Sequence, residues 1–488
     1  MNKEKSGKNV ELLRFWPRTK IVCTLGPSSS SKETLSALID AGMTVARLNF
    51  SHGEHEVHAK NIALIRELSR EKDTHIAILQ DLQGPKIRTG KLKGGAMTLV
   101  AGEQRILTYG AEQTSDSIPI DYRELSNDTC VGSRILMDDG LLAMKVIEMR
   151  GRDVVCEVIY GGILKSRKGV NFPDNKLSIP ATTEKDTRDL LFGVSQNVDY
   201  VALSFVQDAQ DVLKLKQMLR ALGTDIPIIS KIEMLSAVQT IEAICEASDA
   251  LMVARGDLGV ECGFAQVAAY QKRIVTAARN AGKPVIVATQ MLDSMIDNPR
   301  PTKAEIADVA NAVFDLADAT MLSGETASGK HPDLVVRTMR DILSRVDHSG
   351  MLAQIPVPLE NDKNTPEMFA RAAADLAKKC NATAIVCLTL TGNIAKSVAR
   401  HRPHTPIIAI SPRPDVVRKL SLVRGVIGLQ NPLFLDTDKA ISEVGRILAS
   451  KGLVSVGDLI VITGGIPVTS MRPTNLIKLH RISEDDFL

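Results

Sequence analysis

The sequence predicts an α/β fold: a (β/α)8 TIM barrel, with a small all-β domain inserted in it and a further α/β domain after it. Eight short apolar, strand-like runs follow Thr19, and helix-like segments separate most of them. Repeated β-then-α units imply a parallel sheet, and eight units favour a closed barrel. A long interruption after the third run, where short alternating runs replace the repeat, indicates the inserted domain. An open, doubly wound sheet is the alternative that the pattern alone leaves.

The expected strands are short apolar runs, the form of a strand buried on both faces. In chain order they cover residues 20–25, 44–49, 76–81, 200–205, 227–233, 250–254, 284–289 and 319–322. The clearest helix-like segments cover residues 32–40, 209–222, 237–245 and 266–281.

The domain limits follow from changes along the chain. Short alternating runs such as 105–109 and 141–147 lie between glycine-rich turns, which predicts the inserted β domain. Beyond Pro358 a helix (366–379) and strands (383–388, 406–410 and 458–462) begin a new unit. The expected organisation is a flexible leader (1–16), the barrel (17–88 and 184–352), the inserted domain (89–183) and the C-terminal α/β domain (353–488).

Composition excludes several classes of function. The 488 residues suggest about three domains, and 44% hydrophobic content supports a sizeable core. A net charge of +3 without long single-sign blocks, and only 3% aromatic residues, argue against nucleic-acid and polybasic membrane surfaces. The seven cysteines are scattered without a Cys-x2-Cys pair, which is typical of reduced thiols in a cytoplasmic protein. No apolar run approaches the length of a membrane span.

Charge appears at the carboxyl ends of two central strands. The fifth run leads into Lys231 and Glu233, and the sixth leads into Arg255 and Asp257. Burying an unpaired charge costs far more than a short strand gains, so these ends should open onto a ligand. The carboxyl ends of the strands form the active site of a (β/α)8 barrel. Two carboxylates without a neighbouring His or Cys suit a hard Mg²⁺ or Mn²⁺ ion.

Cations converge on the same expected mouth. Arg47 lies near the end of strand two, Arg88 follows strand three, and Lys231 ends strand five. Carboxylates, a metal ion and fixed cations are the recurring parts of phosphoryl transfer. A single Arg or Glu at a strand end is more often part of a surface ion pair. Charge at the same end of at least five strands is what favours a site here.

Two further patterns favour structural explanations. His52, His55 and His58 have a metal-like i, i+3 spacing, but their segment is polar, as an exposed surface would be. Residues 324–331 nearly match the P-loop pattern G-x4-G-K-[ST], but a histidine stands where the hydroxyl should meet Mg²⁺. We expect this segment to end strand eight and to lead into a helix with Pro332 at its first position.

Five runs at the strand ends resemble the signature sequences of one enzyme family. They are NFSHG (49–53), ISKIE (229–233), MVARGDLGVE (252–261), ATQML (288–292) and MLSGET (321–326). Through these runs the chain resembles the pyruvate kinase family. The similarity covers nearly the whole chain from Thr19, and the long run 252–261 is highly specific.

The resemblance implies that the protein transfers the phosphoryl group of phosphoenolpyruvate to ADP, giving ATP and pyruvate in the last step of glycolysis. It implies that Glu233 and Asp257 hold the Mg²⁺ or Mn²⁺ ion. Lys231 would stabilise charge on the transferred group, and Arg47 would bind the substrate phosphate. Backbone amides near Gly256 and Asp257 would bind the substrate carboxylate.

The resemblance also assigns roles around the acceptor. Thr289 would lie where the enolate is protonated, completing a catalytic set with Lys231 and Arg47. His52, Arg88 and Lys168 would face the nucleotide. Lys168 belongs to the inserted domain, which in this family closes as a lid and excludes water before transfer.

One departure from the family pattern concerns the monovalent cation. The residues that would bind K⁺ are Asn49, Ser51, Asp81 and Leu82, and all are present. Potassium-dependent members usually read Asp-Thr-Lys-Gly-Pro-Glu after strand three, whereas this chain reads DLQGPK (81–86). Lys86 thus places a fixed positive charge close to where K⁺ would act. We expect activity that needs little or no K⁺.

The C-terminal domain is where this family binds phosphorylated allosteric effectors. Thr389, Thr391, Gly392 and Asn393 match the position of the family's phosphate loop, and such residues could hold a phosphate at a helix N-terminus. An ordinary strand-to-helix turn is the alternative. By family habit we also expect a homotetramer.

Two other functions fit parts of the pattern. A Mg²⁺-dependent lyase or aldolase acting on pyruvate enolates would explain the barrel mouth and its carboxylates, but not Lys168 or Arg88. A degenerate barrel that only binds metabolites would predict loss of the catalytic residues, and all of them are present.

Overall fold

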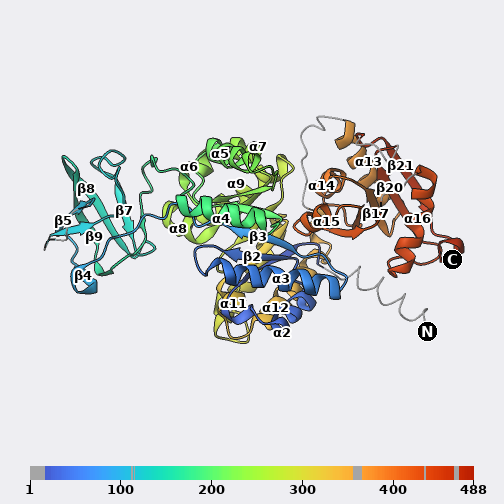
Figure 1. Cartoon of the computed structure of the whole chain (residues 1–488), viewed down its shortest axis with the longest axis horizontal. Coiled ribbons are helices and arrows are strands. Elements are labelled where there is room, and N and C mark those ends of the chain that lie inside the picture. Colours follow the sequence, from blue (N-terminus) through green and yellow to red (C-terminus); the bar gives the residue numbers. More distant parts are fainter. Residues whose placement is uncertain are drawn as a thin grey trace.

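Three units lie in a row along the molecule (Figure 1): a β domain at one end, a barrel in the middle and a C-terminal α/β domain at the other end. This computed structural model describes residues 17–110, 114, 116–354, 365–432, 436–466 and 472–487. The expected leader, residues 1–16, lies outside the described residues.

The central unit is a closed barrel of eight parallel strands, in the order β1-β16-β15-β14-β13-β12-β3-β2. This confirms the closed barrel and removes the doubly wound alternative. The strands are β1 (Lys20–Leu25), β2 (Val45–Asn49), β3 (Ala77–Asp81), β12 (Tyr200–Leu203), β13 (Ile228–Ile232), β14 (Ala250–Ala254), β15 (Val285–Ala288) and β16 (Ala319–Leu322).

Helices follow the strands and cover the outside of the barrel (Figure 1). They are α2 (Lys32–Ala41), α3 (His55–Glu71), α4 (Glu184–Ser195), α5 (Ala209–Ala221), α6 (Leu235–Gln239), α7 (Ile241–Ala247), α8 (Arg255–Cys262), α9 (Phe264–Asn280), α10 (Lys303–Phe314), α11 (Gly324–Ala327) and α12 (Pro332–Asp347). Single-turn 3-10 helices are η1 (Pro27–Ser29), η2 (Lys93–Gly95), η3 (Asp293–Ile296), η4 (Met351–Gln354) and η5 (Glu484–Phe487). As expected, α12 begins with Pro332.

Several expected boundaries were wrong, for local reasons. The strands expected over 200–205 and 284–289 end at Leu203 and Ala288, because Phe205 (φ 54°) and Thr289 (φ 72°) leave extended geometry. The helix expected over 237–245 is two helices that meet at Thr240. Arg255 does not extend a strand but begins α8.

Alternate residues of each barrel strand point inward, and this parity positions the site. Val45 of β2, Leu79 of β3 and Ile229 of β13 belong to the packed interior, whereas their immediate neighbours face the helices. Two residues further along, the same parity turns Arg47, Asp81 and Lys231 inward at the carboxyl end of the barrel. The sequence therefore places charge only in the last inward layer of these strands.

The inserted β domain confirms the expected all-β unit. A six-stranded sheet runs in the order β11-β7-β8-β9-β5-β6, and β10 pairs with β4. The strands are β4 (Ala96–Leu99), β5 (Gln104–Thr108), β6 (Ser117–Pro119), β7 (Arg134–Met137), β8 (Leu142–Arg150), β9 (Asp153–Tyr160), β10 (Gly162–Lys165) and β11 (Val170–Asn171). It has its own buried core.

The C-terminal domain is a five-stranded sheet in the order β19-β18-β17-β20-β21, with only β21 antiparallel to its neighbour. Its strands are β17 (Ala384–Leu388), β18 (Ile407–Ser411), β19 (Val426–Gln430), β20 (Leu459–Gly464) and β21 (Leu476–Arg481). Its helices are α13 (Thr365–Lys379), α14 (Asn393–Arg400), α15 (Pro414–Leu420) and α16 (Thr437–Ser450).

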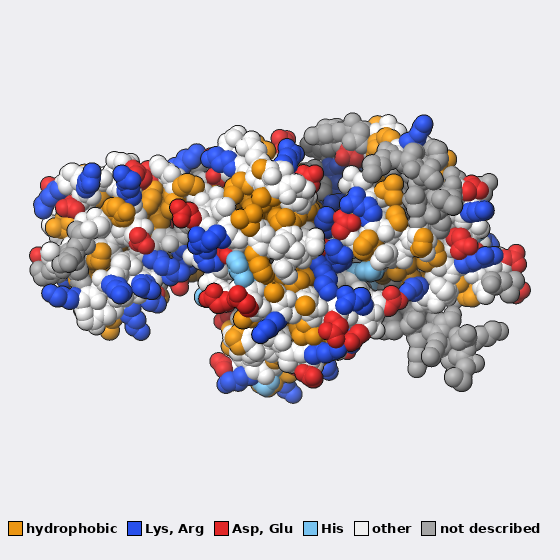
Figure 2. Space-filling model, viewed as in Figure 1, with side chains coloured by type: hydrophobic (Ala, Val, Ile, Leu, Met, Phe, Trp, Pro, Cys, Tyr) orange, Lys and Arg blue, Asp and Glu red, His pale blue; other side chains and the backbone are white. Residues whose placement is uncertain are grey.

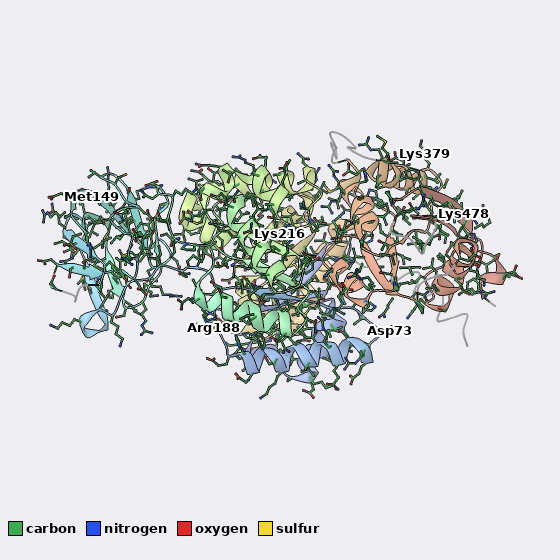
Figure 3. The ribbon with its side chains drawn as sticks, turned by 45° about the horizontal axis from the view of Figure 1, so that its top comes forward. Asp73, Met149, Arg188, Lys216, Lys379 and Lys478 are labelled. Carbon is green, nitrogen blue, oxygen red and sulfur yellow. The ribbon has the colours of Figure 1, made fainter. Side chains whose placement is uncertain are left out.

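The C-terminal domain closes the amino end of the barrel. Leu422 is fully buried in the barrel's interior cluster, and the Tyr200 hydroxyl donates to the Lys419 carbonyl at 2.7 Å. Nearer the rim, Lys451, which follows α16, forms an ion pair with Asp73, which Figure 3 labels. The carboxyl end of the barrel is thus left to the β domain.

Two further properties concern the whole described chain. All seven cysteines are free thiols. No helix in the described residues has both the length and the apolar character that crossing a membrane requires.

Candidate active site

Four charged side chains form a continuous buried network at the carboxyl end of the barrel. Arg47 Nε donates to Asp81 Oδ2 at 2.7 Å, and Lys231 Nζ lies 3.5 Å from Asp81 Oδ1 and 2.8 Å from Glu233 Oε1. Asp81 and Glu233 are each only 1% exposed. The structure therefore joins Arg47, Lys231 and Glu233, as expected, and adds Asp81 as the carboxylate that holds both cations.

Mutual pairing keeps this network charged. Burial opposes ionisation of Asp81, but Lys231 and Arg47 outweigh it and hold the pKa of Asp81 below its ordinary value. Burial also works against the Lys231 ammonium, but Asp81 and Glu233 outweigh it and raise the pKa of Lys231. Lys231 is thus a permanent, desolvated cation aimed at the barrel mouth.

Two hydroxyl groups complete the network, and the sequence reading missed both. Arg47 Nη1 donates to Thr24 Oγ1 at 2.9 Å, and Lys231 Nζ donates to Ser204 Oγ at 2.7 Å. Thr24 lies two residues after the inward Val22, and Ser204 lies two residues after the inward Ala202. Strand parity could therefore have found them.

The two predicted metal ligands fit a divalent ion. Burial and the nearby Asp257 carboxylate raise the pKa of Glu233, against the opposing effect of Lys231. Glu233 Oε2 also accepts a hydrogen bond from the Phe205 amide at 2.6 Å, which fixes the carboxylate. Two repelling carboxylates at the edge of a buried site are stabilised by a hard cation with oxygen ligands. Glu233 and Asp257 could hold Mg²⁺ or Mn²⁺ here.

A short helix holds the other half of the site. α8 begins at Arg255, so Gly256 and Asp257 lie in its first turn, where amide groups lack helical partners. The Gly256 amide donates to Thr289 Oγ1 at 2.9 Å, and Thr289 Oγ1 donates to the Ala288 carbonyl at 2.6 Å. The predicted residues Gly256, Asp257 and Thr289 therefore lie together.

Arg255 was expected at the mouth of the barrel, but its guanidinium instead has a structural role. Its guanidinium donates to Asp308 Oδ1 at 2.7 Å and to the Thr289 carbonyl at 2.7 Å. Arg255 thereby fixes Thr289, which has φ 72°, in its unusual backbone conformation.

The predicted nucleotide residues are only partly brought together. The Arg88 side chain is exposed, and the Arg88 backbone forms an antiparallel β-bridge with Gly169. The Thr89 amide donates to the Lys168 carbonyl at 2.8 Å. Arg88 and Lys168 thus lie on paired segments where the β domain joins the barrel. Lys168 Nζ contacts Asp138 at 2.7 Å. His52 is exposed on the β2–α3 loop, with its carbonyl accepting from His58 Nε2 at 3.0 Å.

Lys86 reaches the metal side of the site. Its Nζ lies 3.8 Å from Asp257 Oδ1. Among the predicted K⁺ ligands, Asn49 lies beside Asp81 in the strand register of the barrel. The Asn49 Oδ1 atom already accepts a hydrogen bond from the Ser51 amide at 3.1 Å. The Leu82 carbonyl accepts from Ser204 Oγ at 2.7 Å.

The β domain meets the mouth through few polar contacts and a cavity. Asn171 Nδ2 donates to Glu261 Oε1 at 2.9 Å. Burial is the main cause that raises the pKa of Glu261, to about 7. Beside this contact lies a cavity that is partly open to solvent, whose lining includes Lys86, Phe172 and Met234. The junction between the β domain and the barrel is therefore not fully packed.

Two secondary candidates have local structural roles. His55 Nε2 contacts Asp189 Oδ1 at 2.7 Å, whereas His58 Nε2 contacts the His52 carbonyl, so the His55 and His58 rings are held by different groups. In the predicted effector loop, the Gly392 amide donates to Thr389 Oγ1 at 2.8 Å and the Asn393 amide donates to Thr391 Oγ1 at 3.4 Å. These hydroxyl groups therefore hold the turn that leads into α14.

Comparison with known proteins agrees with this geometry. Residues 16–336 match the family model "Pyruvate kinase, barrel domain", and residues 367–480 match "Pyruvate kinase, alpha/beta domain". A pyruvate kinase of Geobacillus stearothermophilus is 44% identical over 96% of this chain and 81% of its own length. One of Clostridium perfringens is 43% identical over 95% of this chain and 100% of its own length.

A solved structure extends the likeness to the fold. A pyruvate kinase from Cryptosporidium parvum is 37% identical and superposes with a TM-score of 0.89, covering 97% of each chain. The match spans the barrel, the β domain and the C-terminal domain together. The chain is a member of the pyruvate kinase family.

Proposed function

We propose that the mouth of the barrel transfers the phosphoryl group of phosphoenolpyruvate to ADP, giving ATP and pyruvate. The observation that carries this proposal is the buried network of Arg47, Asp81, Lys231 and Glu233. It fixes two cations toward one point, as a phosphoryl group in transfer requires.

Arg47 and Lys231 have distinct roles in this proposal. Arg47 is tied to both Asp81 and Thr24, so its remaining guanidinium hydrogens can bind the substrate phosphate without reorganisation. Lys231 is buried and permanently charged, so it stabilises the charge that develops on the transferred group. Asp81 positions both cations and does not touch the substrate.

The divalent ion would be held by Glu233 and Asp257. Bound there, it would supply charge neutralisation between substrate and phosphoryl oxygens. The chain's own contribution is to place these carboxylates beside Lys231 and to fix Glu233 through the Phe205 amide.

The first turn of α8 and Thr289 would handle the rest of the substrate. The Asp257 amide suits the substrate carboxylate, and the Gly256 amide would join it by exchanging its hydrogen bond to Thr289 Oγ1 for one to the substrate. Thr289 Oγ1, already within 2.9 Å of the Gly256 amide, would relay a proton to the enolate through water.

The β domain would act as a lid over the nucleotide. Arg88 and Lys168 sit at its root, and the adjoining cavity leaves room for closure. Closure would bring these cations, with His52, to the ADP phosphates and exclude water.

We further propose that Lys86 replaces the monovalent cation. Its ammonium lies 3.8 Å from Asp257 Oδ1 and supplies fixed positive charge on the metal side of the site. Comparable rates in potassium-free tetramethylammonium buffer and in KCl are expected; a collapse of the rate without K⁺ would refute this role.

The regulatory features remain predictions. A phosphorylated effector at the loop 389–393, a homotetramer and a cytoplasmic location are consistent with the family. Equilibrium sedimentation would test the tetramer, and titration of Thr389→Ala with phosphorylated sugars and nucleotides would test the loop.

One assay tests the main proposal. Pyruvate formation from phosphoenolpyruvate is measured with and without ADP and with and without Mg²⁺. Release only when both are present is the expected result. Pyruvate formed from an aldol substrate without nucleotide would contradict a kinase and indicate a lyase.

A further inference from the structure

A second cluster of cations lies far from the mouth, between the barrel and the C-terminal domain. Lys and Arg side chains recur along this border in Figure 2. Here a cavity that is partly open to solvent is lined by Arg279 and Lys283 of the barrel and by Lys396, Arg400 and Arg402 of the C-terminal domain. Asp318 is the single carboxylate in the lining.

That carboxylate is already used. Arg402 binds Asp318 with two hydrogen bonds, at 2.7 and 2.8 Å. Arg400 donates to the Asn280 carbonyl at 2.7 Å and lies 3.4 Å from Glu367, and Lys283 donates to the Ser248 carbonyl at 2.5 Å. These three cations have structural partners.

Arg279 and Lys396 have no such partner. Arg279 is 8% exposed, and the guanidinium makes no hydrogen bond or ion pair to any residue that the structure describes. The Nε atoms of Arg400 and Arg402 are also buried without a hydrogen-bond partner in this part of the chain. Buried donors without acceptors are costly, so several donors directed around one cavity indicate a missing acceptor.

The electrostatics agree with the geometry. Burial lowers the pKa of Arg279, and Arg402 lowers it further, against a smaller opposing effect of Asp318. Burial is also the main cause that lowers the pKa of Lys396; Lys419 and Lys283 add to it and Asp249 opposes it. Asp249 itself contacts Lys216, which Figure 3 labels. Positive charge in the cavity is therefore under-compensated.

A purely structural explanation covers only part of the cluster. Arg279 lies in the last turn of α9, where the helix dipole favours a cation. The dipole does not satisfy the donors of the guanidinium, however, and it does not account for Lys396 in the middle of α14.

We propose that this cavity binds a phosphate-type dianion, either free phosphate or the phosphoryl group of a small metabolite, between the barrel and the C-terminal domain. Guanidinium groups bind phosphate through several parallel hydrogen bonds, and Lys396 adds a point charge. The site is separate from the barrel mouth and from the predicted effector loop, which lies at the opposite end of α14.

The test compares thermal unfolding and calorimetric titration of the full chain with inorganic phosphate, with glycerol 3-phosphate and with chloride at equal ionic strength. Phosphate should raise Tm by about 2 °C or more above chloride. Tighter binding of glycerol 3-phosphate identifies a metabolite as the natural source, and equal or weaker binding identifies free phosphate.

Variants assign the effect to the cavity, because phosphate can also bind at the barrel mouth. Arg279→Gln and Lys396→Gln should lose most of the excess shift, and Arg279→Gln should raise Tm in phosphate-free buffer since it removes a buried unpaired charge. Arg273→Gln, an exposed change of equal charge on α9, should behave as the wild type. An unchanged phosphate shift in both cavity variants, or no shift in the wild type, overturns the proposal.

Discussion

The barrel meets its two neighbouring domains through very different contacts. On the C-terminal side, Arg402 pairs with Asp318 and Arg424 pairs with Asp347, and all four side chains are at most 6% exposed. On the lid side, a representative ion pair is Lys176 with Asp208, whose side chains are 71% and 32% exposed. One junction is held by buried ion pairs, whereas the other has an exposed ion pair and a hydrogen bond from Asn171 to Glu261 beside a cavity.

The difference has a physical consequence for motion. Breaking a buried ion pair leaves an uncompensated charge and costs several kcal/mol, whereas an exposed pair contributes little. The C-terminal domain is therefore expected to move with the barrel as one body. The lid can separate at small cost, which is what substrate entry and water exclusion require.

The largest effect should come from the lid side, where the chemistry lies. Lys231→Met removes the buried cation, so kcat should fall on the order of 10²–10³-fold or more while phosphoenolpyruvate still binds through Arg47. Steady-state kinetics and calorimetry measure the two quantities. Lys214→Met, an exposed lysine on α5, is the matched control. Unchanged turnover in Lys231→Met would remove this lysine from the mechanism.

On the C-terminal side the largest effect should be on stability. Arg424→Ala leaves Asp347, whose side chain is 0% exposed, without its guanidinium partner. The free energy of unfolding should fall by about 3–5 kcal/mol, measured by denaturant titration. Arg413→Ala, which breaks an exposed pair with Asp415 in the same domain, should cost less than about 1 kcal/mol. Equal effects of the two variants would contradict the expected contrast between a buried and an exposed ion pair.

The Arg424 variant also has a pH signature. Burial would raise the pKa of Asp347, but Arg424 and the backbone amides outweigh it and hold that pKa below its ordinary value. A lowered pKa in the folded state contributes stability above the ordinary value of 3.8, and this stability is lost as pH falls. The variant should therefore lose stability mainly above about pH 4 and approach the wild type at lower pH.

Much of the fold and the first contacts of the site could be predicted from the sequence. The βα repeat and its interruption identified the barrel and the inserted domain, and strand-end charge identified Lys231 and Glu233. The alternation of inward-facing residues along the strands would also have identified Thr24 and Ser204 as residues of the site. The role of Arg255 could not be found, because its partners Asp308 and Thr289 lie on later units and only the closed barrel brings them together.

The other limits of the sequence reading have the same origin. The two junctions differ through contacts such as Asn171 with Glu261 and Arg402 with Asp318, which join residues 90 and 84 positions apart. No local pattern encodes such a pairing. The cavity between the barrel and the C-terminal domain likewise combines α9 with α14 and is invisible along the chain.

A smaller effect should follow from reversing the charge of Lys86. Lys86→Glu places a carboxylate where the ammonium lies 3.8 Å from Asp257, so the site regains the need for an external cation. The rate without K⁺ should fall about ten-fold or more, and KCl should restore much of it. Lys91→Glu, an exposed change on the same segment, should show no such dependence. A K⁺-independent Lys86→Glu enzyme would separate Lys86 from cation activation.

The smallest effect concerns how easily the lid opens. Glu261 is buried beneath Asn171, and burial is the main cause that raises its pKa from 4.5 to about 7. The nearby Asp257 and Asp174 carboxylates raise this pKa further. The Asn171 hydrogen bond and Arg134 of the lid lower it in part. Opening the lid exposes Glu261, so the closed form binds more protons than the open form between these pH values. Raising pH through this window should therefore favour opening.

Hydrogen exchange can measure that opening. After correction for the intrinsic pH dependence of exchange, amides of the segment around β11 should exchange about ten-fold faster at pH 8 than at pH 5.5. Glu261→Gln keeps an acceptor for Asn171 but cannot ionise, so its exchange should be independent of pH. Glu148→Gln, an exposed change on β8, should keep the wild-type response. If Glu261→Gln also kept that response, another group would have to control the lid, and the weak junction would owe its mobility to its few contacts alone.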